Sequence, residues 1–348
     1  MVNLALFIPG FLSPKARWAE ADSAVDIALP ALELLLVRAS HTREASGEGS
    51  YEAALCKLFG IEPKAHGDLP IAALTHLVDF EGDHAGVWIR ADPVYLRPDL
   101  GKLLLFDSSA FHIEKEEAET LIREINPILG QQGRPLSFGK DWTRWYLRLP
   151  RAPRIKTYPP STVAGQHIDP YIPAGPDHPD WHRLFNETQM LLHSARVNQA
   201  REARGEPPIN SVWFWGSGAL PATPKVHWTK VWSSEPLAQA LAKFCGCPYA
   251  VPTAVRDCLE EGTAGGDVLV VLHKAQCLSN DSSRWYEYMI DLERDWFAPS
   301  LENLKAGRLA SLTILTAGDS FTVTRPRLRR FWLRRKRIGV YHTLRDAP

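Results

Sequence analysis

The sequence has little cysteine, no excess of charge of either sign and no long apolar run. Its 348 residues include five cysteines, too few for the disulfide framework typical of small secreted domains. Cys245 and Cys247 form a C-x-C pair with no second pair of ligands nearby. We interpret them as small apolar side chains rather than zinc ligands, and we expect a cytoplasmic protein.

The charge balance also excludes some partners. Forty basic and forty acidic residues give a formal net charge of zero, so no global field favours nucleic acid or a membrane surface. No apolar stretch approaches the roughly 20 residues of a membrane span. The N-terminus has no basic region, and its short apolar run ends at Pro9. We interpret this run as a first strand rather than a signal peptide.

Four short apolar runs are typical of buried strands in a mostly parallel sheet. They cover residues 4–8, 211–215, 267–272 and 312–315. Three of them lead into loops that contain glycine, at Gly10, at Gly216-Ser217-Gly218 and at Gly318. In α/β proteins such loops at the carboxyl ends of strands form the functional edge of the sheet. The predicted fold class is therefore α/β, with flanking helices on a mostly parallel central sheet.

The segments between these runs predict helices and an insertion. Helical spacing of apolar residues predicts helices at 50–59, 115–125 and 181–195, the last leading to a cap at Gly205. Residues 87–96 and 102–106 predict a hairpin, and 142–149 predict another strand. Strands in series indicate a strand-rich α+β insertion. We therefore divide the chain into 1–76 as the first part of the core, 77–176 as the inserted subdomain, and 177–348 as the second part.

One segment combines polar groups with glycines that permit close backbone approach. Asn198 and Arg201 lie at a predicted helix end, Asn210 begins the next strand, and Gly216-Ser217-Gly218 follows it. A guanidinium and two amides beside backbone N–H groups can hold a phosphate or carboxylate. The alternative is that the asparagines cap a helix–strand junction and the glycines form a tight turn. Both interpretations stay open at this point.

The same segment carries a family resemblance. The order of asparagine, arginine, glycine, proline, asparagine, strand, G-x-G and proline over 197–221 resembles archaeal-type cofactor-independent phosphoglycerate mutases. The fuller pattern, with N-x-x-Q-M-L-L-H at 186–193 and the tryptophans Trp213 and Trp215, resembles bacterial RpfE-type proteins over nearly the whole chain. Asp92-Pro-Val-Tyr-Leu96 fits that group too, and Asp92 and Arg97 complete the set of candidate ligand-binding residues.

The resemblance implies an alkaline phosphatase-like fold and a site with two metal ions and a serine or threonine nucleophile. It implies metal ligands after three strands: an Asp-Gly, an Asp/His cluster and an Asp-His. This sequence departs from that pattern at each place. Pro9-Gly10 follows the first strand, His273-Lys274 and Asp281 follow a later one without the full pattern, and Asp319-Ser320 follows the last, offset by one residue and without histidine.

These departures predict a phosphoglycerate-mutase-like protein that has lost the two-metal site and binds a phosphorylated or carboxylated small molecule in a regulatory role. We expect no cofactor; manganese or zinc would be needed only by an enzyme. The alternative is an active mutase or phosphomonoesterase with an altered site. Ser13 and Ser40-His41 are weak candidates for the hydroxyl of such a site. A weaker alternative is nucleic-acid association through the basic residues 325–337, for which we favour an ordinary amphipathic element instead.

Overall fold

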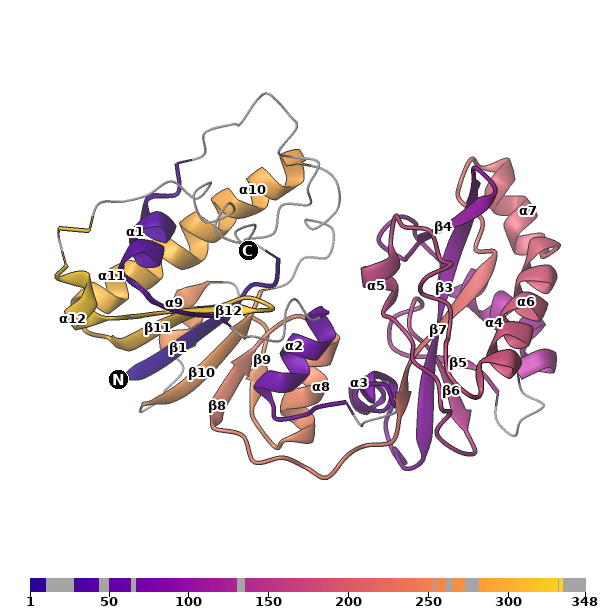
Figure 1. Ribbon diagram of the computed structural model, residues 1–348, viewed down its shortest axis with the longest axis horizontal. Coiled ribbons are helices and arrows are strands. Elements are labelled where there is room, and N and C mark those ends of the chain that lie inside the picture. Colours follow the sequence, from indigo (N-terminus) through magenta and orange to yellow (C-terminus); the bar gives the residue numbers. More distant parts are fainter. Residues whose placement is uncertain are drawn as a thin grey trace. The chain divides into compact units, whose positions relative to one another are not determined.

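The computed structural model describes residues 1–10, 28–43, 50–63, 67–129, 135–252, 254–260, 265–272, 282–330 and 332–333. The chain forms two compact units (Figure 1). The first comprises Met1–Leu55 and Lys225–Pro348, and the second comprises Cys56–Pro224. The second unit extends beyond the expected insertion at 77–176 in both directions, because helix α3 (Ile71–Asp79), helix α6 (His178–His193) and strand β7 (Ser211–Gly218) pack into it.

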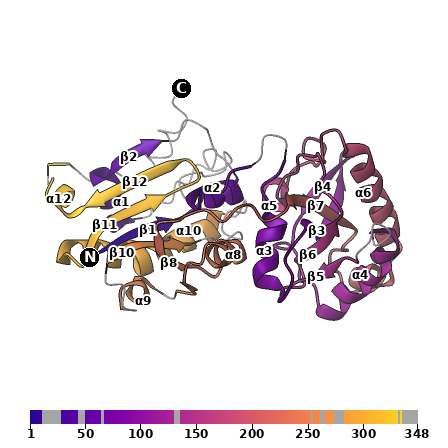
Figure 2. The same ribbon diagram turned by 90° about the horizontal axis from the view of Figure 1, so that it is seen from below.

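The first unit is built on a sheet in the order β2-β12-β11-β1-β10-β8-β9 (Figure 2). Strands β1 (Val2–Phe7), β10 (Gly266–Val271), β8 (Trp228–Trp232), β9 (Tyr249–Ala250) and β11 (Leu309–Leu315) run parallel. Strand β12 (Asp319–Thr324) runs antiparallel to β11, and β2 (Ser40–Arg43) runs antiparallel to β12. The parallel strands predicted at 4–8, 267–272 and 312–315 are confirmed.

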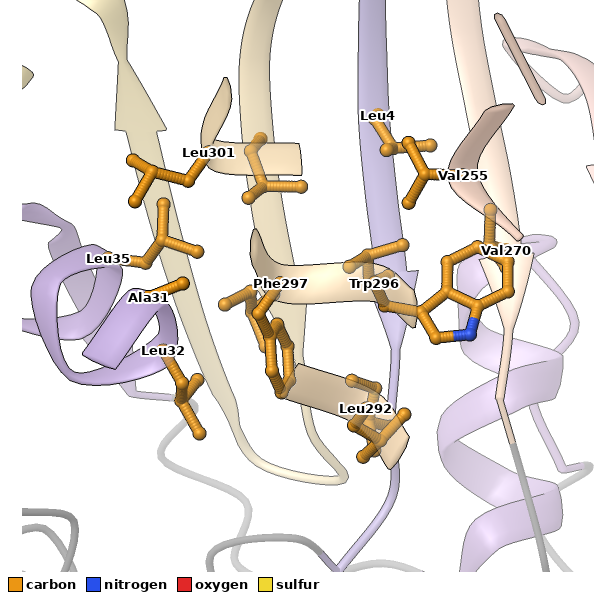
Figure 3. Close-up of a cluster of buried hydrophobic side chains, with 14 of the residues drawn as sticks. Leu4, Ala31, Leu32, Leu35, Val255, Val270, Leu292, Trp296, Phe297 and Leu301 are labelled. Carbon is orange, nitrogen blue, oxygen red and sulfur yellow. The ribbon is translucent and has the colours of Figure 1, made fainter. Parts of the chain in front are cut away.

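One face of this sheet is covered by α1 (Pro30–Arg38), α9 (Val255–Glu260), α10 (Ser282–Leu292), the π-helix η4 (Glu293–Phe297) and α11 (Ala298–Ala306). In Figure 3, Trp296 reaches toward Val270, and Phe297 lies on the side of Leu32. Leu4 of β1 belongs to the same buried cluster. Full burial of each such large side chain contributes on the order of 1.5–3 kcal/mol.

The opposite face receives the alternate residues of the strands. Phe7 is fully buried there, and its ring stacks on Tyr51 at the start of α2 (Tyr51–Leu58). Helix α8 (Pro236–Phe244) packs on β8 and β9. Because β1 is covered on both faces, it has the continuous apolar run that identified it in the sequence.

The second unit has an antiparallel sheet in the order β4-β3-β6-β5, and β7 also pairs with β3. Strand β3 (Val87–Asp99) pairs with β4 (Lys102–Phe106), β6 (Trp145–Leu149) and β7, while β5 (Ser137–Phe138) pairs with β6. Its helices also include α4 (Lys115–Leu129), α5 (Pro160–Val163) and α7 (Arg196–Ala203). The predicted hairpin at 87–106 is confirmed.

Strand β7 corrects one prediction. Residues 211–215 were expected in the central parallel sheet, but β7 pairs antiparallel with β3 in the second unit. Its residues Val212, Trp213 and Phe214 are all buried, and a strand buried on both faces has the same apolar run in either kind of sheet. The predicted helix at 181–195 ends at His193, and α7 starts a new one at Arg196.

Candidate functional site

The carboxyl edge of the parallel sheet brings together three charged or titratable side chains. Asp319 begins β12 directly opposite Arg43 at the end of β2, and His41 lies opposite Phe321. The Nε2 atom of His41 is 2.8 Å from Oδ1 of Asp319, and Nε of Arg43 is 3.5 Å from the same oxygen. The Asp319 side chain is 4% exposed, whereas those of His41 and Arg43 are each 47% exposed. A buried carboxylate therefore holds two partly exposed basic groups.

The backbone and the neighbouring ring fix this arrangement. The hairpin between β11 and β12 is closed by Thr316 N donating to Asp319 O and by Asp319 N donating to Thr316 Oγ1, both at 2.8 Å. The His41 ring stacks on the buried Phe321 ring, with centroids 4.5 Å apart and planes at 7°. The imidazole is thus oriented by one hydrogen bond and one stacking contact.

The described residues at this edge supply few side chains that could bind a metal ion. Pro9 follows β1 and offers no side-chain donor, and the last strand contributes the Asp319 carboxylate beside the His41 imidazole. Within the described ranges, no group of three or more His, Cys, Asp or Glu is placed to hold a metal ion. A pair of divalent ions needs several carboxylate or imidazole ligands. His273, Lys274 and Asp281 lie outside the described residues, as does Ser13.

The candidates Asn198 and Arg201 are used inside the second unit. Arg201 is 1% exposed and donates to Pro207 O at 2.9 Å, His112 O at 2.9 Å and the Glu117 carboxylate at 2.6 Å. Asn198 donates to Leu192 O and Ile209 O and accepts from Ile209 N. These bonds join α7 to α4, to the break after α6 and to the start of β7, which is the structural alternative considered from the sequence.

Asn210 and the glycine segment also make internal contacts. The Asn210 amide accepts from Leu96 N at 2.8 Å and donates to Leu96 O at 2.9 Å, so it extends the ladder between β3 and β7. Gly216 and Gly218 lie within β7 rather than in a loop. A Cβ atom on Gly216 would lie 2.9 Å from Ile71 Cβ, and one on Gly218 would lie 2.7 Å from Pro70 Cβ. Close packing against α3 therefore accounts for both glycines.

Ser217 and Gly216 meet a buried carboxylate. Asp68 accepts hydrogen bonds from the backbone and hydroxyl of Thr157 and from the backbone of Ser217. Thr157 Oγ1 accepts in turn from Gly216 N at 3.1 Å. Burial raises the pKa of the Asp68 carboxyl, and these hydrogen bonds partly offset that rise. The sequence expectation of a glycine loop open to a ligand is thus replaced by an internal link between β7 and the segments at 68 and 157.

Asp92 lies in an ionic network that the sequence did not reveal. It binds the Arg90 guanidinium through both oxygens at 2.9 Å and accepts from Trp145 N and Trp215 Nε1. Burial raises the pKa of Asp92, while the Arg90 charge and these donors act to lower it. Arg97 is exposed, and its guanidinium lies 4.7 Å from the centre of the Phe106 ring. The structure does not bring Arg97 to Asp92.

A second buried carboxylate lies nearby on α3. Asp79 accepts from Arg144 at 2.5 and 2.7 Å and from the Tyr146 hydroxyl at 2.6 Å. Burial would raise the pKa of Asp79, but the Arg144 and Tyr146 hydrogen bonds outweigh it and the pKa is lowered. Burial raises the pKa of the Tyr146 hydroxyl, so this group stays a donor. Because the Asp79 carboxylate already accepts hydrogen bonds from Arg144 and Tyr146, we interpret the contacts among these three residues as structural.

The basic C-terminal segment is partly described. Arg327, in α12 (Arg325–Leu328), donates to Arg38 O and Ala39 O, both at 2.9 Å, and so caps the C-terminal end of α1. Arg38 donates to Leu328 O in return. At this end the segment is a structural element, and residues 334–348 lie outside the described part of the chain. No helix of the described residues has the length and hydropathy needed to cross a membrane.

Sequence comparison links part of the chain to one group of enzymes. No protein-family model matches. The chain is 28% identical over 178 residues to a probable 2,3-bisphosphoglycerate-independent phosphoglycerate mutase of Geobacter sulfurreducens, covering 51% of this chain and 44% of that protein. It is 30% identical over 147 residues to the corresponding mutase of Methanosarcina barkeri, covering 40% and 36%. The chain thus spans less than half the length of these relatives.

Among solved structures, the PH0037 protein from Pyrococcus horikoshii aligns over 93% of this chain and 87% of its own, with a TM-score of 0.55 and 12% identity. This likeness concerns the fold alone, because the sequence identity is low. The chain is therefore a mixed α/β protein that shares its fold with PH0037 and is similar in part, at low identity, to cofactor-independent phosphoglycerate mutases.

Proposed function

We propose that this chain is a phosphoglycerate-mutase-like protein of the bacterial RpfE type, with an alkaline phosphatase-like arrangement, that no longer assembles a two-metal catalytic centre. It acts in the cytoplasm as a regulatory protein that binds a phosphate- or carboxylate-bearing small molecule. The observation that carries the proposal is the side-chain set at the carboxyl edge of the first sheet. There Pro9, which has no side-chain donor, follows β1 where the family resemblance implies a carboxylate, and Asp319 pairs with His41 and Arg43.

The physical argument concerns charge. Phosphoryl transfer between a bound sugar-acid phosphate and a hydroxyl develops negative charge on the attacking and leaving oxygens. In this class of mutase, two metal ions beside these oxygens supply the positive charge that stabilises them. A carboxylate already engaged by a guanidinium and an imidazole is a weakened metal ligand. The same edge keeps two partly exposed basic side chains, which suit an anion. Binding without turnover is the function that this balance supports best.

The test is made on the purified full chain. Metal content after dialysis is measured by elemental analysis, and turnover of 3-phosphoglycerate is followed with added manganese. We expect no stoichiometric metal and no manganese-dependent turnover, together with a rise in melting temperature on adding phosphate or 3-phosphoglycerate. Two tightly held manganese or zinc ions per chain, with a rate in the common enzymatic range of about 1–10³ s⁻¹, would overturn the proposal.

One observation favours a second candidate, an active mutase or phosphomonoesterase with an altered site. His41 is oriented by a buried carboxylate, an arrangement that also serves general acid–base catalysis. In that case manganese or zinc would be the expected cofactor. The turnover assay separates the two candidates directly, because anion binding alone produces no isomer and releases no phosphate.

A further inference from the structure

A ligand anion can be expected at the N-terminus of α1 in the first unit, but this helix end is already filled. The N-terminus of α1 presents backbone N–H groups, which attract anions. Each oxygen of the Glu293 carboxylate accepts a hydrogen bond from one of these groups, from Ala31 N at 2.6 Å and from Leu32 N at 3.0 Å. An internal carboxylate therefore occupies this helix end, whereas the edge formed by β2 and β12 presents the basic side chains of His41 and Arg43.

At that edge, His41 has one ring nitrogen committed and one free to bind. Nε2 faces Asp319, and the stacking on Phe321 prevents the ring from turning. Because the two nitrogens of an imidazole point in different directions, Nδ1 is directed away from Asp319. No described residue forms a hydrogen bond with Nδ1. The half-exposed ring is thus fixed with a polar atom turned outward, an unusual condition for a surface side chain, which ordinarily keeps its rotamer freedom.

Arg43 is the second component. It lies directly opposite Asp319 in the register of β2 and β12, and its Nε approaches the carboxylate at 3.5 Å. The planar guanidinium carries two further nitrogens, which can donate a parallel pair of hydrogen bonds to an oxyanion. Arg43 therefore brings a guanidinium to this edge beside the buried Asp319 carboxylate.

We propose that His41 and Arg43 bind the phosphate group of a phosphomonoester at the carboxyl edge of the first sheet, with Asp319 as the residue that positions both. This assignment rests on the proposed anion-binding function and gives it a ligand class and a location. It differs from the sequence-based candidates Asn198 and Arg201, whose polar atoms are used within the second unit.

The experiment measures binding of inorganic phosphate, 3-phosphoglycerate and glycerate to the full chain by calorimetry. Variants H41Q and R43Q are compared with the controls H227Q and R308Q. The control residues are also exposed, and they lie near the opposite, amino edge of the same sheet. We expect H41Q and R43Q to weaken binding of phosphate and 3-phosphoglycerate by roughly tenfold or more, the loss of one charge-assisted hydrogen bond, and the controls to change it less than twofold.

A spectroscopic measurement makes the test independent of the folding of the variants. In ¹⁵N-histidine-labelled protein, adding phosphate should shift the Nδ1 resonance of His41 more than its Nε2 resonance. In D319N, the phosphate affinity and the phosphate-induced shift of Nδ1 should be lost together, whereas an aspartate that serves only the fold would leave both as they are.

The outcomes separate the two proposals. If the unmutated chain binds neither phosphate nor 3-phosphoglycerate, the proposed function itself fails. If it binds them and H41Q and R43Q bind equally well, with no Nδ1 shift, the site lies elsewhere and only this inference fails. If glycerate binds as tightly as 3-phosphoglycerate, the group recognised is a carboxylate, and the assignment to phosphate is overturned.

Discussion

Arg201 of α7 and Glu117 of α4 form a buried ion pair at 2.6 Å, although 84 residues separate them in the sequence. The guanidinium is 1% exposed and Glu117 is 15% exposed. The guanidinium also donates hydrogen bonds to two backbone carbonyl oxygens, those of Pro207 and His112. These contacts join α7 to α4 and to the segments at His112 and Pro207, so Arg201 acts as a structural link within the second unit.

This pair gives the first prediction. Arg201→Ala should lower the free energy of unfolding by about 3 kcal/mol or more, because it leaves a largely buried carboxylate and two carbonyls with fewer donors. Urea unfolding measures the effect. The control is Arg204→Ala: Arg204 contacts the same Glu117 at 2.7 Å but is 49% exposed, so a loss below about 1 kcal/mol is expected. Equal small losses for both variants would contradict the structural role of Arg201.

The second prediction concerns pH and His76 of α3. Burial, followed by the neighbouring His84, lowers the pKa of His76 to about 4 from an ordinary value of 6.5, while Asp79 and Asp83 oppose this and Arg148 reinforces it. Between pH 6.5 and 4 the unfolded chain binds a proton at this residue and the folded chain does not. Stability should therefore rise with pH across this window, by at most about 1.4 kcal/mol per pH unit for one proton.

Replacing His76 by Phe tests that prediction, because a phenyl ring can keep the stacking on Phe80 and Trp88, with centroids at 4.4 and 3.9 Å. Chemical unfolding at a series of pH values should show a shallower slope between pH 4 and 6.5 for His76→Phe. The exposed His227 supplies the matched control, since His227→Phe should leave the slope as it is. An unchanged slope in His76→Phe would assign the pH dependence to other groups.

The third prediction separates backbone strain from crowding at Gly216. Gly216 has φ of 66° and Gly205 has φ of 74°, and both angles disfavour any residue with a Cβ atom. A Cβ on Gly216 would meet Ile71, whereas nothing lies within 4 Å of one on Gly205. Gly216→Ala should thus destabilise the protein by roughly 1–3 kcal/mol more than Gly205→Ala, as measured by urea midpoints. Similar losses would show that α3 can move away.

Several features of the fold were predictable because they depend on local pattern. Strands β1, β10 and β11 each contain a short, mainly apolar run, and the β3–β4 hairpin has a turn between two strand-like segments. Strand β8 escaped prediction, since in Trp228–Trp232 only the last two residues are buried. For β7, the apolar run predicted a strand correctly, but a run of this kind carries no information about which sheet the strand joins.

The candidate site was less predictable, because it depends on contacts between distant segments. His41 and Asp319 are 278 residues apart in the sequence, and neither lies in a motif that indicates a pairing. Their contact follows from the position of β12 between β2 and β11, which no local pattern specifies. Arg201 and Asn198 had a strong local pattern, but spacing alone does not tell whether a polar side chain turns toward a ligand or toward a neighbouring carbonyl.

The last prediction concerns Glu293, the first residue of the π-helix. Helix α1 begins at Pro30, which has no N–H, and its next two N–H groups, of Ala31 and Leu32, donate to the Glu293 carboxylate. The wider turn of the π-helix places Trp296 and Phe297 in the core while Glu293 reaches the end of α1. Glu293 therefore replaces the side-chain cap that Leu29 cannot provide.

Glu293→Ala should consequently lower the free energy of unfolding by about 1–2 kcal/mol, as for the loss of a helix cap. Glu302→Ala is the control on the neighbouring helix α11, where Glu302 is 69% exposed and pairs with Lys305, and its effect should stay below about 1 kcal/mol.

Added phosphate distinguishes a cap from a vacated ligand site. If Glu293→Ala gained phosphate affinity that survives H41Q, the end of α1 would be an anion site that Glu293 normally blocks. We expect no such gain, because the half-buried Glu293 carboxylate serves as the cap of α1, which is a structural role.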